Sequence, residues 1–347
     1  MKIGIIGLGL MGGSLAKKLR LCEKVEKIIA YDINVDDLKL AKKENIISEY
    51  TTEIDSSFSD LDYIIICTPV RTIVEIAKKL ELYVSQNCLV MDIGSTKSAV
   101  VKDLENMDFN YIGTHPMVGK ETSGFKASDS HLYEKAKFII TPTSKVPKEQ
   151  IEKALEIIRI LEAEPVFMND NEHDGAVSAI SHVPHVVAFS LVNTVKSLDN
   201  DDNILKTIAA GGFKDITRIA SSDPIMWQNI FLENSEEVLK TINEFKTSLN
   251  TLEQYIRDAD KEKIEEYIFS AKEYRDSIDN LKKNNEIDIK ISNTPGELER
   301  IVSILAKNNI NIINLSIQDD IDEKNGTLKL FFNNMDMKEQ AEKILNP

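Results

Sequence analysis

Three glycines near the N-terminus have the spacing of a phosphate-binding turn. The apolar run at residues 3–6 is long enough for a buried strand, and residues 14–19 have a helical pattern. Between them, Gly7 permits a tight turn, Gly9 lets the backbone approach a pyrophosphate, and Gly12 lets the helix pack closely on the strand. The helix N-terminus offers unpaired N–H groups to the anion. We therefore predict a dinucleotide site formed by Gly7, Leu8, Gly9, Leu10, Met11 and Gly12.

Two further stretches fit the same cofactor. Asp32 follows a second strand-like run and lies about 20 residues beyond the last glycine, so its carboxylate is placed to accept hydrogen bonds from an adenosine ribose. A third strand-like run, at residues 63–67, leads into a loop where the ribose and phosphates would pass, formed by Thr68, Pro69 and Val70. The alternatives are a glycine-rich turn in an unrelated α/β domain and, for this loop, a plain strand-to-helix turn.

Two polar side chains follow later strands of the same pattern. Ser95 comes after the run at residues 88–91, where its hydroxyl could contact a nicotinamide or a substrate, or be the N-cap of the next helix, or do both. His115 stands in a loop-like stretch, residues 113–124, that is rich in glycine and proline. We interpret it as an acid–base catalyst, because imidazole titrates near neutral pH, with a buried core histidine as the alternative. His131 has no such context and is predicted to lie on the surface.

The second half of the chain carries candidate anion-binding groups on helices. Ser181, His182 and His185 share a helical stretch, but no third metal ligand stands at a helical offset, which favours a hydrogen-bonding or organic-anion role over a metal. Arg218 lies in an Ile-Thr-Arg-Ile-Ala context that favours partial burial, and a buried arginine requires an anion. A solvated surface arginine is the alternative. Around it stand Gly211, Ser222 and the single tryptophan, Trp227.

The composition limits the classes of protein. With 347 residues, a net charge of −15 and no basic stripe, the chain argues against nucleic-acid and anionic-membrane partners. Its three cysteines have neither metal nor disulfide spacing and are interpreted as reduced packing residues. We find no signal-like N-terminus and no apolar stretch of about 18 residues. We therefore expect a cytoplasmic protein without a membrane-spanning segment.

The pattern along the chain predicts three domains. In residues 1–168, strand-like runs alternate with helical patterns, which predicts a Rossmann-type domain with a parallel sheet and helices on both faces. The predicted strands are residues 3–6, 28–31, 63–67, 88–91, 111–113, 138–141 and 165–168. Residues 169–283 have helical patterns only and suggest an all-α substrate and dimerisation domain, with Pro184 kinking or locally opening the first helix. The predicted helices are residues 174–198, 203–208, 224–252 and 260–281, and residues 211–220 are predicted to join two of them. Residues 286–347 follow a polar linker in the order βαββα, a ferredoxin-like unit that lacks its last strand.

Together these stretches resemble the prephenate/arogenate dehydrogenase family, with a C-terminal ACT-like domain, over nearly the whole chain. The most specific pieces are residues 113–124, 181–185 and 211–227, whereas the glycine turn fits many hydroxyacid dehydrogenases. The resemblance implies an NAD-dependent oxidative decarboxylation in tyrosine biosynthesis. A hydride leaves the ring carbon that bears the hydroxyl, carbon dioxide leaves, and prephenate becomes 4-hydroxyphenylpyruvate.

The resemblance also implies roles for single residues. His115 would be the base at the ring hydroxyl, Ser95 would contact that hydroxyl region and the nicotinamide, and Arg218 would bind a substrate carboxylate. The rest of the substrate wall would comprise Ser181, His185, Gly211, Ser222, Trp227 and a gating or tuning acid, Glu121. Asp32 favours NAD, because the 2′-phosphate of NADP would meet a carboxylate. A homodimer, and tyrosine as an effector of the ACT-like domain, are implied as well.

One position departs from the family pattern. Lys120 stands where the family usually has a small hydroxyl residue. It either adds positive charge beside the base or points into solvent. In the first case it would favour prephenate over arogenate, because arogenate carries an ammonium group.

Other functions stay open at this point. Within the family, arogenate dehydrogenase is the alternative. A 3-hydroxyacid dehydrogenase of the 6-phosphogluconate type shares the glycine turn and a helical second domain, but typically uses a lysine on a Gly-rich helix start that this sequence lacks. A non-catalytic nucleotide and amino-acid sensor is the third possibility, and Ser95, His115 and Arg218 argue against it.

Overall fold

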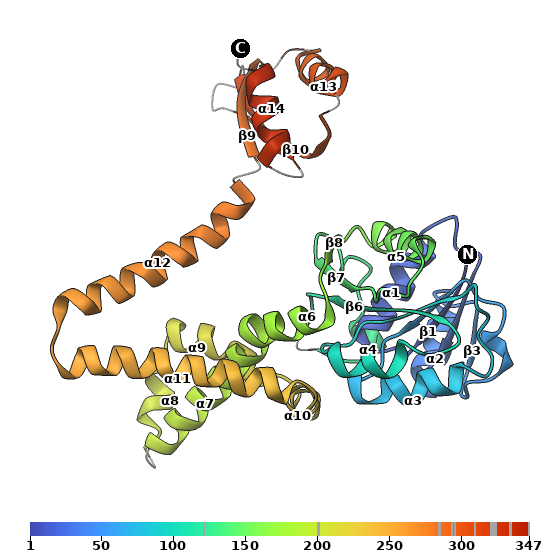
Figure 1. Cartoon of the computed structure of the whole chain (residues 1–347), viewed down its shortest axis with the longest axis horizontal. Coiled ribbons are helices and arrows are strands. Elements are labelled where there is room, and N and C mark those ends of the chain that lie inside the picture. Colours follow the sequence, from blue (N-terminus) through green and yellow to red (C-terminus); the bar gives the residue numbers. More distant parts are fainter. Residues whose placement is uncertain are drawn as a thin grey trace. The chain divides into compact units, whose positions relative to one another are not determined.

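The computed structural model describes residues 1–120, 122–199, 202–283, 286–292, 294, 296–308, 310–319, 325–332 and 335–345. The chain forms two compact units, Met1–Lys246 and Thr247–Pro347, and each is described by itself. Figure 1 shows the helices and strands of both units. The division into three domains at residues 168 and 283 stays a prediction.

The first unit is built on an eight-stranded sheet in the order β3-β2-β1-β4-β5-β6-β7-β8. All seven predicted strands are present, and the sequence analysis missed only the short edge strand β3. The strands are β1 (Lys2–Ile6), β2 (Lys27–Tyr31), β3 (Glu49–Thr51), β4 (Tyr63–Ile66), β5 (Leu89–Asp92), β6 (Asn110–Pro116), β7 (Lys137–Thr141) and β8 (Glu164–Phe167). The helices around them are α1 (Leu10–Arg20), α2 (Val35–Lys43), α3 (Val70–Leu80), α4 (Ser98–Leu104) and α5 (Lys148–Ile160).

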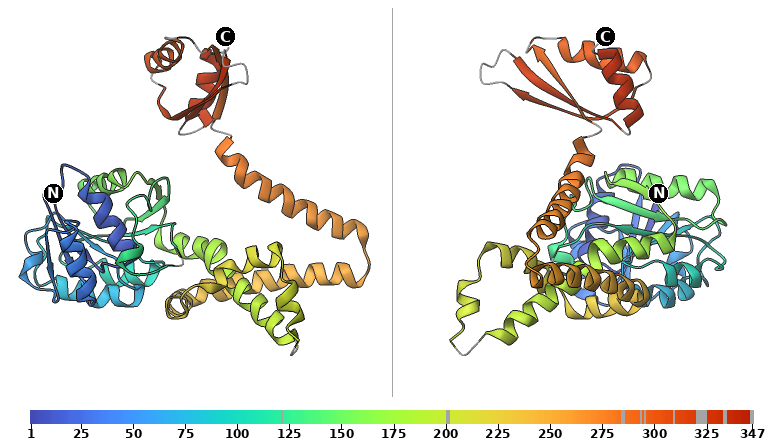
Figure 2. Two further views of the ribbon diagram at one scale, coloured as in Figure 1. Left: turned by 180° about the vertical axis from the view of Figure 1, so that it is seen from behind. Right: turned by 60° about the vertical axis from the view of Figure 1, so that its left-hand side comes forward.

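Two apolar cores lie on opposite faces of this sheet, and helices cover both faces (Figure 2). Successive side chains of a strand point to opposite faces. Ile5 therefore joins the core that contains Leu15 of α1, whereas Ile6 joins the core that contains Ile73 of α3. Helices α1, α2 and α5 contribute to the first core, and α3 and α4 contribute to the second. The doubly wound architecture predicted from the sequence is confirmed.

The sheet is mixed, however, and the prediction of an all-parallel sheet is wrong at one step. Strands β3, β2, β1, β4, β5 and β6 run parallel, but β6 pairs with β7 antiparallel, and β8 is parallel to β7. A parallel neighbour needs a crossover, usually a helix. In the described residues between β6 and β7 the only helix is the short 3-10 turn Phe125–Ala127. The chain therefore enters β7 at the same edge of the sheet at which it leaves β6.

The first helix beyond the sheet is interrupted next to Pro184, as predicted. It consists of α6 (Asp170–Val177), a π-helical turn (Ser178–His182) and α7 (Val183–Leu198). Pro184 has no N–H to donate to the carbonyl four residues earlier, at Ile180, and that residue lies in the middle of the π-helical turn. Such turns often mark functional sites. By length and composition alone this helix could cross a membrane, so the expectation that no apolar stretch reaches this length is wrong.

The remaining helices include one break that the sequence did not predict. They are α8 (Ile204–Ile208), α9 (Gly211–Thr217), α10 (Pro224–Glu233), α11 (Ser235–Arg257) and α12 (Lys261–Lys283). One helix was predicted over residues 224–252, but it ends at Asn234 and restarts. The Asn234 side chain is buried and donates a hydrogen bond to the backbone carbonyl of Asp174. The break therefore results from a tertiary contact.

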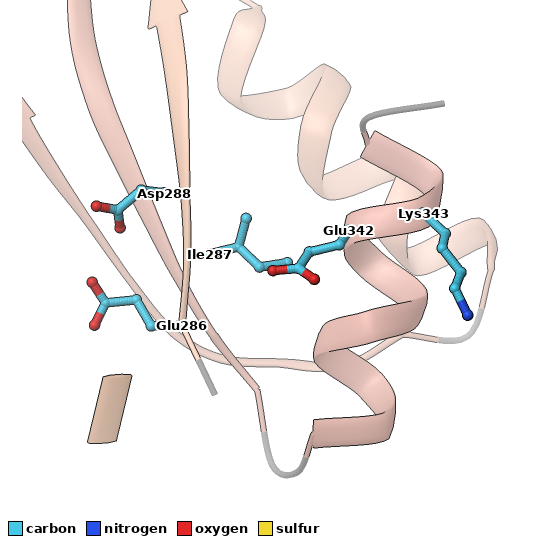
Figure 3. A pocket seen from close by; sticks show the side chains of 5 residues that line it. All are labelled: Glu286, Ile287, Asp288, Glu342 and Lys343. Carbon is cyan, nitrogen blue, oxygen red and sulfur yellow. The ribbon is translucent and has the colours of Figure 1, made fainter. Parts of the chain in front are cut away.

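The end of the chain has the predicted βαββα order. Its elements are β9 (Glu286–Ser292), α13 (Glu297–Lys307), β10 (Ile312–Asp319), β11 (Asn325–Phe332) and α14 (Met335–Leu345), with the antiparallel sheet order β10-β11-β9. Among the described residues β9 is an edge strand. A shallow depression lies between it and α14, where Ile287 points toward the helix and Glu286 and Asp288 point away (Figure 3).

Candidate active site

The glycine turn joins β1 to α1 as predicted. Gly7 has a φ of +94°, and a Cβ on Gly12 would lie 1.9 Å from the carbonyl oxygen of Gly7. Helix α1 can therefore begin this close to the strand only with glycine at position 12. No described atom lies within 4 Å of a Cβ added to Gly9, the N-cap residue of α1. This open space beside the helix N-terminus fits a cofactor pyrophosphate.

The other predicted cofactor residues lie at the same edge of the sheet. Asp32 follows β2, and its Oδ2 accepts a hydrogen bond from the N–H of Leu8 at 2.5 Å, which ties the carboxylate to the glycine turn. Pro69 is the N-cap residue of α3, and the Thr72 hydroxyl donates to the Thr68 hydroxyl at 2.9 Å. Carboxyl ends of adjacent parallel strands converge. The loops after β1, β2 and β4 therefore bring together Gly7, Leu8, Gly9, Leu10, Met11, Gly12, Asp32, Thr68, Pro69 and Val70.

A buried ion pair supports the loop after β5. Asp92 and Lys97 are both fully buried, and the Lys97 ammonium donates to the Asp92 carboxylate. Asp92 also accepts hydrogen bonds from the Tyr111 hydroxyl and the Gly94 N–H, each at 2.7 Å. Removing one partner from such a network would leave an uncompensated buried charge. The network thus holds the loop that carries Ser95, which is half-buried at the carboxyl end of β5.

His115 lies within strand β6, so the prediction that it stands in a loop is wrong. The predicted strand ended at Gly113, because the glycines and the proline that follow are typical of turns. Instead, antiparallel pairing with β7 extends β6 to Pro116, and His115 is opposite Ile139. The imidazole is therefore held on a hydrogen-bonded strand. His131 is exposed, as predicted.

A chain of three side chains links His115 to helix α6. Nδ1 of His115 lies 2.8 Å from Nε2 of His173, and Nδ1 of His173 lies 2.8 Å from Oδ1 of Asp174. His173 and Asp174 are buried. The sequence analysis missed both residues as partners of His115. The available signal was their place just after the last strand of the sheet, in a helix whose start is fixed by a capping box between Asn169 and Glu172.

Asp174 also caps helix α4 across the structure. Its Oδ1 accepts a hydrogen bond from the N–H of Lys97 and its Oδ2 accepts one from the N–H of Ser98, both at 2.8 Å. The carboxylate thus satisfies N–H groups at the start of α4 that have no partner within the helix. The alternative role of Ser95 as the N-cap of this helix is therefore wrong.

The protonation states follow from burial and from these partners. Burial lowers the pKa of His115 well below its usual value, and His173, Lys97 and His182 lower it further. Burial also lowers the pKa of His173, although Asp174 partly opposes this. Burial alone would raise the pKa of Asp174, but hydrogen bonds from His173 and from the start of α4 lower it overall. At neutral pH the hydrogen-bonded side chains are therefore one carboxylate, Asp174, and two neutral imidazoles, His173 and His115.

The next turns of the same helix present further histidines. His182 is buried, and burial lowers its pKa to about 4. His185 is half-buried, its Nδ1 lies 2.9 Å from the carbonyl oxygen of Ser181, and its ring stacks on Trp227 with 3.6 Å between centroids. The indole N–H of Trp227 is buried without a hydrogen-bond partner among the described residues. Within the residues that the structure describes, no group of three or more His, Cys, Asp or Glu side chains is placed to hold a metal ion.

The residues around Arg218 lie in and beside α9, which the sequence analysis described only as a junction between helices. Arg218 is exposed, so the predicted partial burial is wrong for the single chain. Its charge nevertheless contributes to lowering the pKa of His185, after the larger effect of burial, so the two side chains lie near each other. Gly211 is the first residue of α9. The Ser222 hydroxyl donates to the carbonyl of Ile219 at 2.7 Å.

The two remaining predicted residues follow β6. Lys120 is exposed and forms an ion pair with Asp129 at 3.0 Å. Its charge is thus partly compensated. Glu121 lies outside the described residues.

Comparison with known proteins identifies the family. Residues 15–166 match the nucleotide-binding domain of prephenate dehydrogenase, and residues 169–293 match its dimerization domain. Prephenate dehydrogenase of Bacillus subtilis (strain 168) is 33% identical, over 98% of this chain and 94% of that protein. Prephenate dehydrogenase of Lactococcus lactis subsp. cremoris is 30% identical, over 99% of this chain and 97% of that protein. This chain belongs to the prephenate dehydrogenase family.

A solved structure of the family supports the same assignment. Prephenate dehydrogenase from A. aeolicus, in complex with hydroxyphenyl propionate and NAD+, superposes with a TM-score of 0.77 and 41% identity, over 80% of this chain and 98% of that one. The family, the Rossmann-type fold and the NAD-dependent dehydrogenase class predicted from the sequence are confirmed. Family membership decides against the 6-phosphogluconate type of enzyme and against a non-catalytic sensor.

The glycine turn supplies a matched pair of substitutions. Gly12→Ala places a methyl group against the Gly7 carbonyl, so we expect a loss of roughly 1–3 kcal/mol in the free energy of unfolding, together with weaker NAD binding. Gly9→Ala meets no described atom, so we expect an unchanged Tm but weakened NAD binding. Thermal unfolding and NAD titration measure both. Wild-type NAD affinity in Gly9→Ala would contradict this assignment of the pyrophosphate site.

Proposed function

We propose that this chain is an NAD-dependent prephenate dehydrogenase, which converts prephenate into 4-hydroxyphenylpyruvate and carbon dioxide in tyrosine biosynthesis. The observation that carries the proposal is His115, a neutral histidine held on strand β6. Strand β6 is next to β5, and the loop that follows β5 carries Ser95 at the cofactor edge of the sheet. The family members from Bacillus subtilis and Lactococcus lactis share 94% and 97% of their length with this chain. Bound NAD supplies the hydride acceptor.

The protein residues then position the substrate and move its proton. His115 accepts the proton of the ring hydroxyl, for which an imidazole must be neutral near pH 7. Ser95 hydrogen-bonds the same hydroxyl region and the nicotinamide. The formation of an aromatic ring drives the loss of carbon dioxide, so catalysis consists mainly of orientation and proton transfer.

The two carboxylates of prephenate need positive charge in a protein with a net charge of −15. Arg218 binds one of them, in the electrostatic range of His185. The rest of the wall consists of Ser181, His185, Gly211, Ser222 and Trp227. The buried indole N–H of Trp227 has no hydrogen-bond partner among the described residues. Glu121 is the gating or tuning acid in this proposal.

The protein forms a homodimer through its helical part. The match to the family's dimerization domain supports this, as do the large apolar side chains that the single chain exposes there, among them Ile216, Ile225, Leu232 and Leu239. Isolated monomers rarely expose so many in one region. The same surface explains why helix Asp170–Leu198 is apolar yet poorly buried. Free Cys22, Cys67 and Cys88 support a reducing, cytoplasmic location.

Replacing His115 tests the assigned base. We expect His115→Ala to lower kcat about 10²- to 10⁴-fold with prephenate while NAD binding is retained, because only proton transfer is lost. His131→Ala, at the exposed histidine, is the matched control and should leave turnover unchanged. In the wild type, kcat/KM should fall with acidity only below about pH 6.5, because the pKa of His115 is lowered. NADH formation from prephenate measures the turnover of both variants and the pH dependence of the wild type. Full activity of His115→Ala would refute the assignment.

Lys120 addresses the choice between prephenate and arogenate. If its charge repels the ammonium group of arogenate, kcat/KM should be higher for prephenate, and Lys120→Ser should narrow the difference. The ion pair with Asp129 and the exposure of Lys120 limit the effect to at most about fivefold, which is typical for a screened surface charge. Lys126→Ser, at an exposed lysine in the same segment, is the control. A wild-type preference for arogenate would sink this hypothesis.

The βαββα unit is an ACT-like regulatory domain at which tyrosine inhibits the enzyme. Its strand order and its two helices on one core support this. Tyrosine should inhibit the full-length enzyme, and the inhibition curve should shift to higher tyrosine in a chain truncated after Asn285 that keeps its basal turnover. Identical curves for the two proteins would exclude this role and leave the unit as a dimerisation element.

A further inference from the structure

The hydrogen-bond chain behind His115 determines which of its nitrogens carries the proton. Asp174 is ionised and can only accept, so Nδ1 of His173, at 2.8 Å, must be the N–H nitrogen. A neutral imidazole has one N–H, so Nε2 of His173 is an acceptor. Nδ1 of His115, 2.8 Å from it, must then carry the hydrogen, which leaves Nε2 of His115 with a free lone pair.

We propose that His173, anchored by Asp174, is a positioning residue that holds His115 in the Nδ1–H tautomer and thereby makes Nε2 the catalytic base. This rests on the role of His115 proposed above. His173 itself is fully buried, and both of its ring nitrogens are engaged, so it does not touch the substrate. Its effect on the reaction passes through His115 alone.

Asp174 is fixed well enough to act as the anchor. Besides His173, it accepts hydrogen bonds from two backbone N–H groups at the start of α4, and its own backbone carbonyl accepts one from the Asn234 side chain. A carboxylate with this many donors keeps its charge and its orientation. Because it binds the start of α4, the same carboxylate also fixes the end of the loop that carries Ser95. Asp174 thus holds both the ring that positions His115 and the loop of Ser95.

The proton balance of the reaction suits a buried chain. The hydroxyl proton moves to Nε2 of His115 as the hydride leaves for the cofactor. The carbon–carboxylate bond then breaks, carbon dioxide leaves, and the electron pair of that bond completes the aromatic ring and places negative charge on the oxygen. That oxygen takes the proton back from Nε2. No net proton is released, so the base only holds one between two steps, and no path to solvent is required.

Holding that proton requires a nearby negative charge. While His115 is an imidazolium, its Nδ1–H still donates to His173, which is itself hydrogen-bonded to the Asp174 carboxylate. Lys97, His182 and, when it is charged, His173 all disfavour the protonation of His115, but burial lowers the pKa of His173 and keeps that ring neutral at neutral pH. Lys97 is paired with Asp92, which limits its effect. The chain through His173 is therefore the feature that steadies the transient cation.

A pair of substitutions at His173 separates positioning from folding. His173→Leu has a similar volume but no acceptor, and we expect kcat to fall about 10²- to 10⁴-fold, the usual contribution of a general base, with KM and NAD affinity little changed. His173→Gln carries a carbonyl oxygen that can accept from Nδ1 of His115, and its kcat should recover to within about tenfold of the wild type. His131→Gln is the control for the substitution itself. Equal losses in the Leu and Gln variants would overturn the proposal.

The tautomer can also be read without any turnover. The chain has five histidines, so 15N-histidine labelling gives five pairs of ring-nitrogen signals, and His115→Gln identifies the pair that belongs to His115. In the wild type without ligands we expect a protonated Nδ1 and an unprotonated Nε2 for this ring at neutral pH, and loss of this state in His173→Leu. A protonated Nε2 in the wild type overturns the inference. Because this readout does not need prephenate, it stands even if the proposed activity fails.

Discussion

The buried carboxylate of Asp174 is the interaction on which the arrangement of this site depends. It accepts hydrogen bonds from the backbone at the start of α4 and from the ring of His173, and so it joins the helical part of the first unit to the loop after β5. A buried charge is costly unless donors surround it, and the fold supplies them from two elements distant in sequence. Displacing α6 from the sheet would leave those donors and the carboxylate unpaired. The position of the helix is therefore strongly determined.

The mixed sheet serves the same end. Because β7 returns antiparallel to β6, strand β6 continues past the end of β5 and carries His115 on hydrogen-bonded backbone. A histidine on a free loop would lose conformational entropy each time it reached a catalytic geometry. Here folding fixes the ring, because His115 is on a paired strand and lies at hydrogen-bond distance from His173. The buried Asp92–Lys97 pair holds the neighbouring loop in a similar way.

Differences in burial and in nearby charge give the histidines different roles. His115, His173 and His182 are kept neutral mainly by burial, which suits proton transfer. Farther along the same helix, His185 is half-buried, stacks on Trp227 and lies in the field of Arg218, which suits the recognition of an anion. The π-helical turn, Ser178–His182, lies between His173 and His185 along this helix. One helix thus contributes to both the chemistry and the binding surface.

The sequence by itself determined the elements whose signals are local. The glycine spacing, Asp32 and the alternation of strands and helices predicted the cofactor edge of the sheet, because a turn at Gly7 and a helix start at Gly12 depend on neighbouring residues only. The family motifs also predicted His115, Arg218 and the residues around them as one site. The effect of Pro184 on its helix was predictable for the same local reason.

Only the tertiary structure decided what His115 contacts. The antiparallel β6–β7 pairing, the contact between Asn234 and Asp174, and the hydrogen bond between His115 and His173 all join residues 22 or more positions apart in sequence, and no local pattern encodes their encounter. Packing of α6 against the end of the sheet brings His173 within hydrogen-bond distance of His115, and burial then fixes the charges of both rings. The base was predictable from sequence, but its tautomer was not.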